Sequence, residues 1–364
     1  MNKKLRITFI IPFTVKTGGI AVVLEYYKRL TAMGHEISVI YPMFPYREYL
    51  YSETFKSVAR KIYTVLRGFQ INLIKFTRKI SHFSENFPIK PVLVVNDFFI
   101  PDADAVIATA WPTAYDVAKL SPKKGRKFYL VQDYETWQGR IKEVDNSYRL
   151  PLHTITIAPW LTELMKEMFG RDDDNLTEIR NGIRLDKFYP PETKNFETPS
   201  LLLMAHDLES KGTRDAIDAL TIVKERYPQL EIKMFGMYAK PAAPFEFEYH
   251  RNPPYEKLLS LYQDAAIFIF PSRIEGWGLT PIEAMACGCA LVATNVGCIP
   301  IFNNGQNMVI VEAKNPASIA EGVIKLLDDK ALAESIAKEG LKRMQGEGWE
   351  KAAEKLLETI KSKL

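Results

Sequence analysis

The order of apolar and polar positions along the chain predicts alternating strands and helices. Leu5–Ile11 is a short apolar run, and it leads through a Gly18-Gly19 turn into an apolar-periodic segment over residues 20–33. Ile37–Tyr41 is the next apolar run. Short apolar runs are typical of buried strands, and a 3.6-residue period is typical of a helix packed on one side. Strand, turn, helix and strand together predict a βαβ unit, and therefore a parallel sheet with helices on its faces.

The same alternation continues along the chain and divides it in two. Residues 190–200 are polar and Pro-rich, which is typical of a linker, and a second series of runs opens at Leu201–Ala205. At 364 residues the chain is longer than one typical core. We therefore expect an α/β protein with one Rossmann-like domain over 1–190, another over 200–345 and a last helix over 349–364. Further apolar runs predict strands at Val92–Asn96, Ala105–Ala108, Lys127–Val131 and Phe245–Tyr249.

The bulk composition is that of an ordinary soluble globular protein, with 47% hydrophobic and 25% charged residues. No apolar run approaches the roughly 20 residues that a membrane span needs, and Pro12 interrupts the first run too early for a secretory signal. Cys287, Cys289 and Cys298 have no histidine nearby, so we expect core thiols in a reducing compartment and no zinc site. These features predict a cytoplasmic protein.

Charge is distributed unevenly between the two halves. Residues 1–190 hold 28 Lys and Arg against 20 Asp and Glu, whereas residues 191–364 hold 20 against 24. Residues 54–84 contain seven basic residues, no acidic residue and interleaved aromatic residues. This pattern favours peripheral contact with an anionic membrane surface. The alternative is a solvated helix whose apolar side belongs to the core. No nucleic-acid motif accompanies the charge, so no nucleic-acid partner is expected.

Residues 267–288 predict a strand, a glycine-rich turn and a short helix. Thr280 is a suitable N-cap, with Pro281 at the first helical position and Gly288 ending the helix. Backbone N–H groups at such a helix start can bind an anion. Two carboxylates, Glu275 and Glu283, lie eight positions apart in this stretch. An alternative reading of Thr280 and Glu283 is a capping box, in which the carboxylate only caps its own helix.

The E-x7-E pattern within PSRIEGWGLTPIEAMACG resembles the donor site of family-4 retaining glycosyltransferases. The resemblance implies the GT-B fold, in which two Rossmann-like domains face each other across a cleft and the C-terminal helix crosses back to the first domain. It implies that Glu275 contacts the donor sugar and Glu283 the nucleotide ribose, without a metal ion or other cofactor. It further implies that the diphosphate is held by the turn and helix start formed by Gly276, Trp277, Gly278, Leu279 and Thr280.

A second donor-side match lies after the Leu201–Ala205 run. The family has a G-R-L-x-x-x-K-G loop there, and this chain matches it at Lys211 and Gly212 but has Asp207 in place of the arginine. An acidic residue beside a diphosphate requires another cation, for which Arg184, Arg251 and Arg273 are candidates. The alternative is that Lys211 is a surface lysine. Asn181, in an N-G-I sequence, resembles a family motif near the domain junction and is expected on the donor side.

The first half of the chain carries the candidate acceptor side. Gly18 and Gly19 correspond to the family's first glycine-rich turn, and Trp111 stands where the family often has a histidine. Gln132-Asp133-Tyr134-Glu135 follows an apolar strand and resembles a subgroup that includes bacterial rhamnosyltransferases. In this reading Asp133 or Glu135 orients or deprotonates an acceptor hydroxyl, with Gln132 beside them. The alternative is a loop whose carboxylates cap a helix or face water.

The expected function is transfer of a sugar from a nucleotide diphosphate to a hydroxyl of a glycan or lipid-linked glycan, with retention at the anomeric carbon. L-rhamnose is suggested by the Q-D-Y-E resemblance alone. Asp207 and the missing histidine leave open a catalytically silent nucleotide- or glycan-binding protein. A nucleotide-sugar epimerase or a phosphorylase is a further alternative, although the acid–base groups or the cofactor lysine that these enzymes need are not identifiable.

Overall fold

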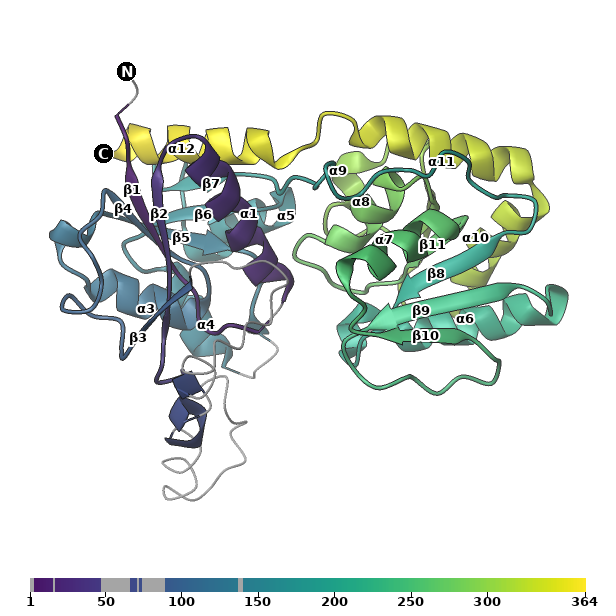
Figure 1. Ribbon diagram of the computed structural model, residues 1–364, viewed down its shortest axis with the longest axis horizontal. Helices are drawn as coiled ribbons and strands as arrows, with labels where there is room; N and C mark the ends of the chain where they lie inside the picture. The colour runs from purple at the N-terminus through teal and green to yellow at the C-terminus, as the bar shows by residue number, and fades with distance from the viewer. Residues whose placement is uncertain (1–2, 16, 47–65, 71, 74–88, 137–139) are drawn as a thin grey trace. The chain divides into compact units, whose positions relative to one another are not determined.

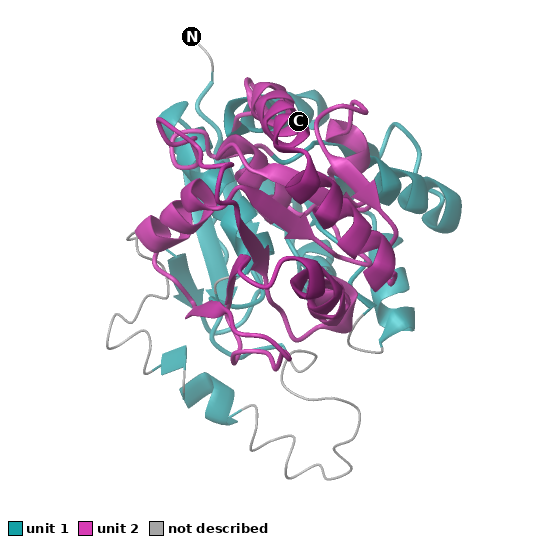
Figure 2. Ribbon diagram, turned by 90° about the vertical axis from the view of Figure 1, so that its right-hand side faces the viewer, with its two compact units in different colours: residues 1–181, 349–364 teal, residues 182–348 magenta. Residues whose placement is uncertain are grey.

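The computed structural model describes residues 3–15, 17–46, 66–70, 72–73, 89–136 and 140–364. The chain divides into two compact units, coloured separately in Figure 2: unit 1 is residues 1–181 with 349–364, and unit 2 is residues 182–348. Most of the basic segment 54–84 lies outside the described residues. No helix in the described ranges has the length and apolarity needed to cross a bilayer.

Unit 1 is built on a seven-stranded parallel sheet with strand order β3-β2-β1-β4-β5-β6-β7 (Figure 1). Its described helices connect successive strands, as expected for βαβ units. The chain order reverses between β1 and β4, which is where open α/β sheets bind ligands at the carboxyl ends of their strands. The elements are β1 (Arg6–Ile10), α1 (Gly18–Ala32), β2 (Glu36–Pro42), β3 (Ile89–Val92), β4 (Ala105–Ala108), α3 (Trp111–Lys119), β5 (Arg126–Val131), α4 (Ile141–Tyr148), β6 (His153–Thr156), α5 (Pro159–Phe169) and β7 (Leu176–Glu178).

The last helix of the chain, α12 (Trp349–Lys363), belongs to unit 1 and packs on α1. The Tyr26 and Trp349 rings meet edge to face with centroids 5.5 Å apart. Arg29 Nε lies 3.3 Å from Glu350 Oε1 beside them. The buried positions of α12 include Trp349, Ala353 and Ile360, which share one side of a helix and give it an apolar face to bury. The predicted return of the C-terminal helix to the first domain is confirmed.

Unit 2 is built on a six-stranded parallel sheet with strand order β10-β9-β8-β11-β12-β13, and its chain order reverses between β8 and β11. The prediction of two Rossmann-like α/β domains is therefore confirmed. The elements are β8 (Ser200–Met204), α6 (Thr213–Arg226), β9 (Glu231–Gly236), β10 (Glu248–Arg251), α7 (Tyr255–Asp264), β11 (Ile267–Phe270), α8 (Leu279–Ala286), β12 (Ala290–Thr294), α9 (Ile299–Phe302), β13 (Val309–Val311), α10 (Pro316–Asp328) and α11 (Lys330–Met344).

Both faces of the unit 2 sheet are covered at β11, so this central strand is apolar throughout. Ile267 and Ile269 of β11 join a core with Leu220 of α6 and Val323 of α10. The residue between them, Phe268, points to the other face, where its ring centroid lies 5.6 Å from that of Tyr262 on α7. Alternation of side chains along a strand explains why β11 reads as a continuous apolar run rather than an alternating one.

Three predicted boundaries are wrong. The strand expected at Val92–Asn96 is β3, which ends at Val92, and Leu93 and Val94 beyond it are exposed. The strand expected at Phe245–Tyr249 is β10, which begins three residues later. The chain enters unit 2 at Gly182, before the predicted linker over 190–200, because the segment beyond it is fastened to unit 2: the Ile183 N–H donates to the Glu347 carbonyl at 2.8 Å, and the Lys194 amine donates to the Tyr262 carbonyl at 2.7 Å.

Candidate functional site

The loops that follow β8 and β11 meet at the carboxyl edge of the unit 2 sheet, where the chain order reverses. Gly212 has a φ of +66°, and a Cβ at this position would lie 2.0 Å from the Pro271 carbonyl oxygen. The Arg273 N–H donates to the Ser210 carbonyl at 2.7 Å, which links the two loops a second time. Only glycine permits the two backbones to come this close. Gly212 thereby places its neighbour Lys211 next to the loop that carries Glu275.

The Lys211 amine and the Glu275 carboxylate form an ion pair at this edge. Their side chains keep only 18% and 13% of their surface exposed. Lys211 therefore pairs with the carboxylate that was predicted to act with it. The alternative of a solvated surface lysine does not fit this mostly buried ion pair. Two residues that are 64 positions apart in sequence are brought together because β8 and β11 are neighbours in the sheet.

Arg273 is held by two acidic residues. Its Nε and one terminal nitrogen donate to the two Asp215 carboxylate oxygens, each at 2.8 Å, and its other terminal nitrogen pairs with Glu209. The hydrogen bonding that Arg273 donates to Asp215 is the largest cause of a raised Arg273 pKa. Arg273, one of the three candidate cations for the missing family arginine, therefore already uses its guanidinium nitrogens to bind acidic residues of unit 2. It joins the first turn of α6 to the loop after β11.

The turn over Gly276, Trp277 and Gly278 is packed into unit 2. The Trp277 side chain is buried edge-on against Phe302 with ring centroids 5.9 Å apart, so only its backbone is available to a ligand. Gly297, after β12, has a φ of +63°, and a Cβ there would lie 2.3 Å from the Trp277 carbonyl oxygen. The Cys298 N–H donates to that same oxygen at 2.6 Å. The loop after β12 therefore packs against the turn that carries Trp277 and supports it.

Helix α8 begins at Leu279 after Gly278, not after Thr280 as predicted, because Gly278 has a φ of +88° and supplies the non-helical turn. No side chain in the described part of the chain caps this helix start. The capping-box alternative is also wrong, because Glu283 is the fifth helical residue instead of the third. Its carboxylate accepts a hydrogen bond from the Tyr262 hydroxyl at 3.0 Å. Gly288 follows the end of the helix with a φ of +74°, as predicted.

Asp207 lies exposed in the loop between β8 and Lys211. The preceding residue, His206, accepts the Leu208 N–H through Nδ1 at 2.9 Å, and burial together with Lys211 lowers the pKa of its ring. Of the other two candidate cations, Arg251 donates through Nε to the Met237 carbonyl at 3.3 Å. The guanidinium of Arg184 lies over the Phe188 ring, 5.2 Å from its centroid.

In unit 1, two of the predicted acceptor-side residues, Gly19 and Gln132, meet near the point where its own sheet reverses order. Gly18 begins α1, and a Cβ on Gly19 would lie 3.2 Å from the Gln132 amide nitrogen. That nitrogen is 3.4 Å from the Thr109 carbonyl, and the Gln132 amide oxygen is buried without a partner among the described residues. These residues follow β1, β4 and β5, so parallel pairing of the strands explains why they converge.

Glu135 is a buried carboxylate at the start of α3. It accepts the Trp111 N–H at 3.1 Å, and burial raises its pKa to about 8. The Trp111 side chain is itself buried. This is the capping role that the sequence left open, although the helix that Glu135 caps precedes it in the chain instead of following it.

Two other predicted site residues, Asp133 and Asn181, are partly exposed and buried, respectively. The Asp133 carboxylate accepts the Tyr134 N–H at 2.8 Å, and its carbonyl accepts the Tyr148 hydroxyl at 3.1 Å. Asn181 ends unit 1 and is buried, and neither polar atom of its amide has a hydrogen-bond partner among the described residues. A buried amide without partners is costly, so Asn181 is a position where a ligand or water contact would stabilise the protein.

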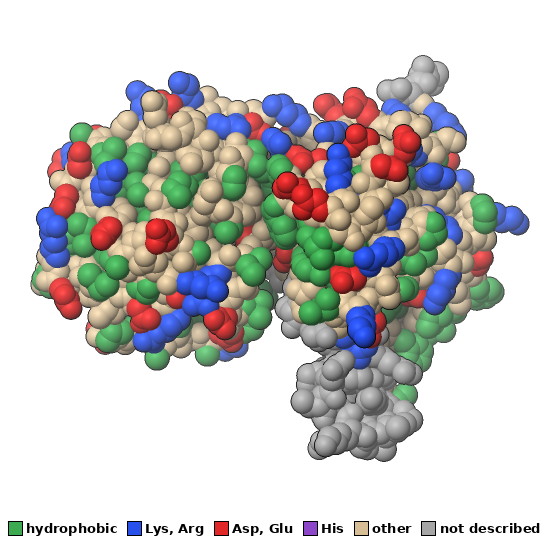
Figure 3. Space-filling view, turned by 180° about the vertical axis from the view of Figure 1, so that it is seen from behind, with side chains coloured by type: hydrophobic (Ala, Val, Ile, Leu, Met, Phe, Trp, Pro, Cys, Tyr) green, Lys and Arg blue, Asp and Glu red, His purple; other side chains and the backbone are tan. Residues whose placement is uncertain are grey.

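Sequence reasoning missed Tyr262, Asp215 and Glu209, which hold Glu283 and Arg273. Tyr262 stands in the apolar segment LLSLYQDA and reads as core, and Asp215 reads as an ordinary first-turn acid of a helix. Within the described residues, no group of three or more His, Cys, Asp or Glu side chains could hold a metal ion. On the face shown in Figure 3, Lys and Arg side chains of both units are interspersed with Asp and Glu.

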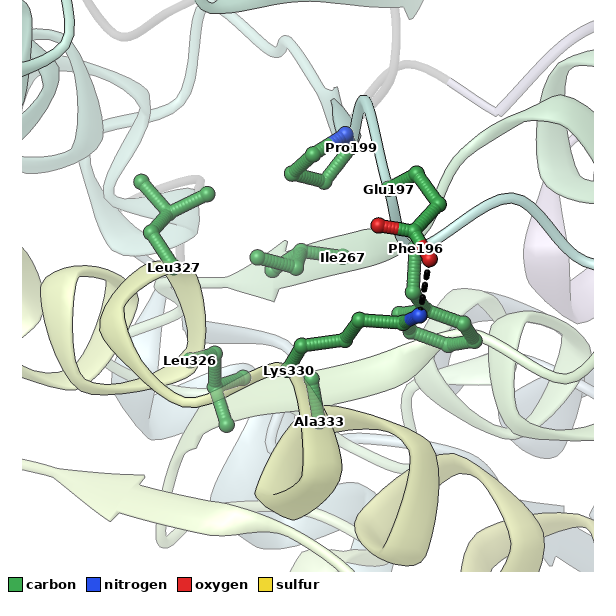
Figure 4. A pocket seen from close by; sticks show the side chains of 8 residues that line it. All are labelled: Phe196, Glu197, Pro199, Ile267, Leu326, Leu327, Lys330 and Ala333. Carbon is green, nitrogen blue, oxygen red and sulfur yellow. Dashed lines mark hydrogen bonds and ion pairs between the residues drawn. The ribbon is translucent and has the colours of Figure 1, made fainter.

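A small cavity of about 150 Å³ lies at the opposite edge of the unit 2 sheet, by the first residue of β11 (Figure 4). Six of its eight lining residues are apolar, and the other two, Glu197 and Lys330, form an ion pair. It is separate from the edge that carries Lys211 and Glu275, because that edge follows the last residue of β11.

Comparison with known proteins gives these sites a context. Residues 186–343 match the family model described as glycosyl transferases group 1. D-inositol 3-phosphate glycosyltransferase of Paenarthrobacter aurescens is 24% identical over 62% of this chain and 60% of its own length. The capsular polysaccharide biosynthesis glycosyltransferase CapM of Staphylococcus aureus is 28% identical over 45% of this chain and 48% of its own. The chain thus spans less than two thirds of the length of these curated relatives.

Solved structures resemble the chain over nearly its whole length. Sucrose-phosphate synthase from Thermosynechococcus elongatus superposes with a TM-score of 0.71, 15% identity and 99% coverage of both chains. HepE of Anabaena, solved in complex with UDP-glucose, superposes with a TM-score of 0.71 and 13% identity, covering 98% of this chain and 100% of that one. The fold of the chain is therefore GT-B, and over residues 186–343 the chain resembles glycosyl transferases group 1.

Proposed function

We propose that the protein is a glycosyltransferase that takes its donor sugar from a nucleoside diphosphate bound to unit 2. The observation that carries this proposal is the Lys211–Glu275 pair, which lies where the sheet order reverses and leads directly into the turn before α8. The amine and the N–H groups at the start of α8, which no described side chain caps, provide positive charge for a diphosphate. Glu275 provides a hydrogen-bond acceptor for the hydroxyls of the sugar that is attached to this diphosphate.

The proposed reaction breaks the bond between the anomeric carbon and the diphosphate oxygen and forms a bond from that carbon to the oxygen of an acceptor hydroxyl, whose proton passes to the departing diphosphate. Charge develops on the departing diphosphate, so cations and backbone N–H groups placed there lower the barrier. Lys211, Gly212 and the Gly276–Leu279 backbone would serve this purpose, and Glu283 would hold the ribose. Transfer with retention at the anomeric carbon, and without a metal ion or other cofactor, is part of the proposal.

The acceptor is proposed to bind at the unit 1 edge formed by Gly19, Gln132 and Thr109. The Gln132 amide oxygen, which is buried and has no partner among the described residues, supports this choice, because a hydroxyl of the acceptor would satisfy it. A glycan or lipid-linked glycan supplies such hydroxyls. L-rhamnose remains the donor sugar to be tried first, on the strength of the Q-D-Y-E sequence.

Contact with an anionic membrane is a separate part of the proposal, and it rests on the composition of residues 54–84. Leu66 and Phe98, two described residues of unit 1, are 56% and 86% exposed, which adds apolar surface on that unit. The test is sedimentation with phosphatidylglycerol vesicles, comparing the natural chain with the triple variant Lys56→Glu, Arg60→Glu and Lys61→Glu. Equal sedimentation of the two proteins would contradict it.

The function is tested by incubating the protein with UDP-, dTDP-, GDP- and ADP-sugars and measuring free nucleoside diphosphate, with and without glycan acceptors. Acceptor-dependent release from one donor is the expected result, and NMR of the product gives the anomeric configuration. Conversion of the donor sugar without any acceptor would point to an epimerase. Asp207 favours one other outcome, a silent binding protein, which would bind a donor without turnover.

A further inference from the structure

Tyr262 and Glu283 are joined by a hydrogen bond between two neighbouring helices of unit 2. The Tyr262 hydroxyl on α7 donates to Glu283 Oε2 on α8 at 3.0 Å. Glu283 is partly exposed, whereas Pro281, Ile282 and the four residues from Ala284 to Cys287 are buried. Among residues 281–287, Glu283 is thus the only one that is not buried, and the orientation of its carboxylate is set partly from inside the protein.

Three aromatic rings pack around the Tyr262 ring and thereby fix the direction of its hydroxyl group. The centroids of Phe188, Phe235 and Phe268 lie 5.7, 5.7 and 5.6 Å from that of Tyr262. Burial, reinforced by the neighbouring Glu283, raises the pKa of the phenol well above its ordinary value. The phenol is therefore protonated at every working pH and acts toward the carboxylate only as a donor.

The backbone beneath this contact is also fixed. The Lys194 amine donates to the Tyr262 carbonyl at 2.7 Å and to the Cys287 carbonyl at 3.0 Å. These carbonyls lie near the end of α7 and just after the end of α8, so a single ammonium group joins the two helices. The separation of Tyr262 and Glu283 is consequently set by three hydrogen bonds, none of which needs a ligand.

We propose that Tyr262 is a positioning residue that presents the Glu283 carboxylate to a ribose hydroxyl of the donor nucleotide. The inference rests on the proposed function, because it assumes that a nucleotide lies along α8. A glutamate side chain loses rotational freedom when it binds a hydroxyl, and a carboxylate already held on one oxygen loses less. Tyr262 therefore strengthens recognition of the sugar part of the nucleotide and leaves recognition of the base and the diphosphate unchanged.

The test compares a nucleoside diphosphate with its 2′,3′-dideoxy counterpart, which lacks the hydroxyls that Glu283 would bind. UDP and 2′,3′-dideoxyuridine diphosphate are titrated calorimetrically, or the thymidine pair if that base binds better. The expected result is that the natural protein prefers the hydroxylated nucleotide and that Tyr262→Phe reduces this preference about tenfold, the usual effect of losing one hydrogen bond to a charged group. Affinity for the dideoxy nucleotide should not change.

Tyr255→Phe is the matched control, since Tyr255 lies in the same helix and its hydroxyl donates to the Lys187 backbone carbonyl, away from Glu283. It should keep the natural preference. An undiminished preference in Tyr262→Phe would overturn the inference, whereas failure of the natural protein to bind either nucleotide would instead refute the proposed function.

If Tyr262→Phe does not fold, the position can be filled by two analogues of nearly equal size. 4-Aminophenylalanine keeps a donor at the end of the ring, and 4-methylphenylalanine lacks one. The inference predicts that the amino analogue keeps the preference for ribose hydroxyls and that the methyl analogue loses it. Equal preferences in the two proteins would overturn it.

Discussion

Lys211 and Glu275 form an ion pair across the point at which the unit 2 sheet reverses its chain order. The pair joins the loop after β8 to the loop after β11, and the backbones of the two loops are in contact at Gly212 and Pro271. A ligand with a diphosphate would compete with Glu275 for the lysine. The two residues should therefore respond to mutation in different ways.

Glu275→Gln is expected to separate binding from transfer. The substitution removes the competing carboxylate, so affinity for the nucleoside diphosphate should stay the same or increase. Transfer should fall at least about 100-fold, because the contact to the donor sugar is weakened in the transition state. Calorimetry with the diphosphate and a transfer assay are run on the same preparation. Retained transfer, or a large loss of diphosphate affinity, would contradict the assigned role.

Gly212→Ala should destabilise unit 2 by at least about 2 kcal/mol, because the new Cβ would enter the Pro271 carbonyl and the backbone has a left-handed conformation. Gly305→Ala is the control in the same unit: Gly305 has a φ of +82°, but a Cβ there meets no atom within 4 Å. Its cost should be near 1 kcal/mol. Urea unfolding of both variants measures the difference, and equal losses would mean that the loop contact is unimportant.

Arg273→Lys should destabilise the protein by about 2–3 kcal/mol. Lysine keeps the charge but cannot donate to both Asp215 oxygens and to Glu209, and the Arg273 and Asp215 side chains are only 16% and 8% exposed. Arg214→Lys is the control, since the Arg214–Asp218 pair lies on the surface with 69% and 41% exposure. It should change the free energy of unfolding by less than about 0.5 kcal/mol. Similar effects for the two substitutions would show that the hydrogen bonds of the Arg273 guanidinium do not contribute to stability.

Stability should depend on pH through Glu135. Its pKa is raised from 4.5 to about 8, so the folded state holds this proton over a pH range in which the unfolded chain has lost it. The contribution to stability is complete below pH 4.5 and is lost as pH rises toward 8, by up to about 1.4 kcal/mol per pH unit. Glu135→Gln removes the titrating group and keeps an acceptor for the Trp111 N–H. The difference in unfolding free energy between the two proteins, followed from pH 5 to 8.5, should shift steadily in favour of Glu135→Gln. A constant difference would mean that Glu135 titrates normally.

The sequence predicts the architecture well because apolar periodicity and glycine turns are local signals. It brings Lys211 and Glu275 to neighbouring strands once a parallel sheet is assumed. It does not predict that Arg273 is held by Asp215, because that contact depends on how α6 begins. It misplaces the start of α8, since Thr280 is a good N-cap by type but Gly278 alone can adopt the required backbone. The role of Tyr262 is hidden because a tyrosine in an apolar helix looks like any other core residue.

The central claim is that unit 2 binds a nucleoside diphosphate through Lys211. The most direct measurement is thermal unfolding of the natural protein and of Lys211→Met with UDP, dTDP, GDP and ADP, each with and without EDTA. Ligand at 100 times its dissociation constant adds about 2.7 kcal/mol, so one diphosphate should raise the unfolding temperature by several degrees, unaffected by EDTA. The shift should be largely lost in Lys211→Met. No shift with any diphosphate, or an equal shift in both proteins, would contradict the account.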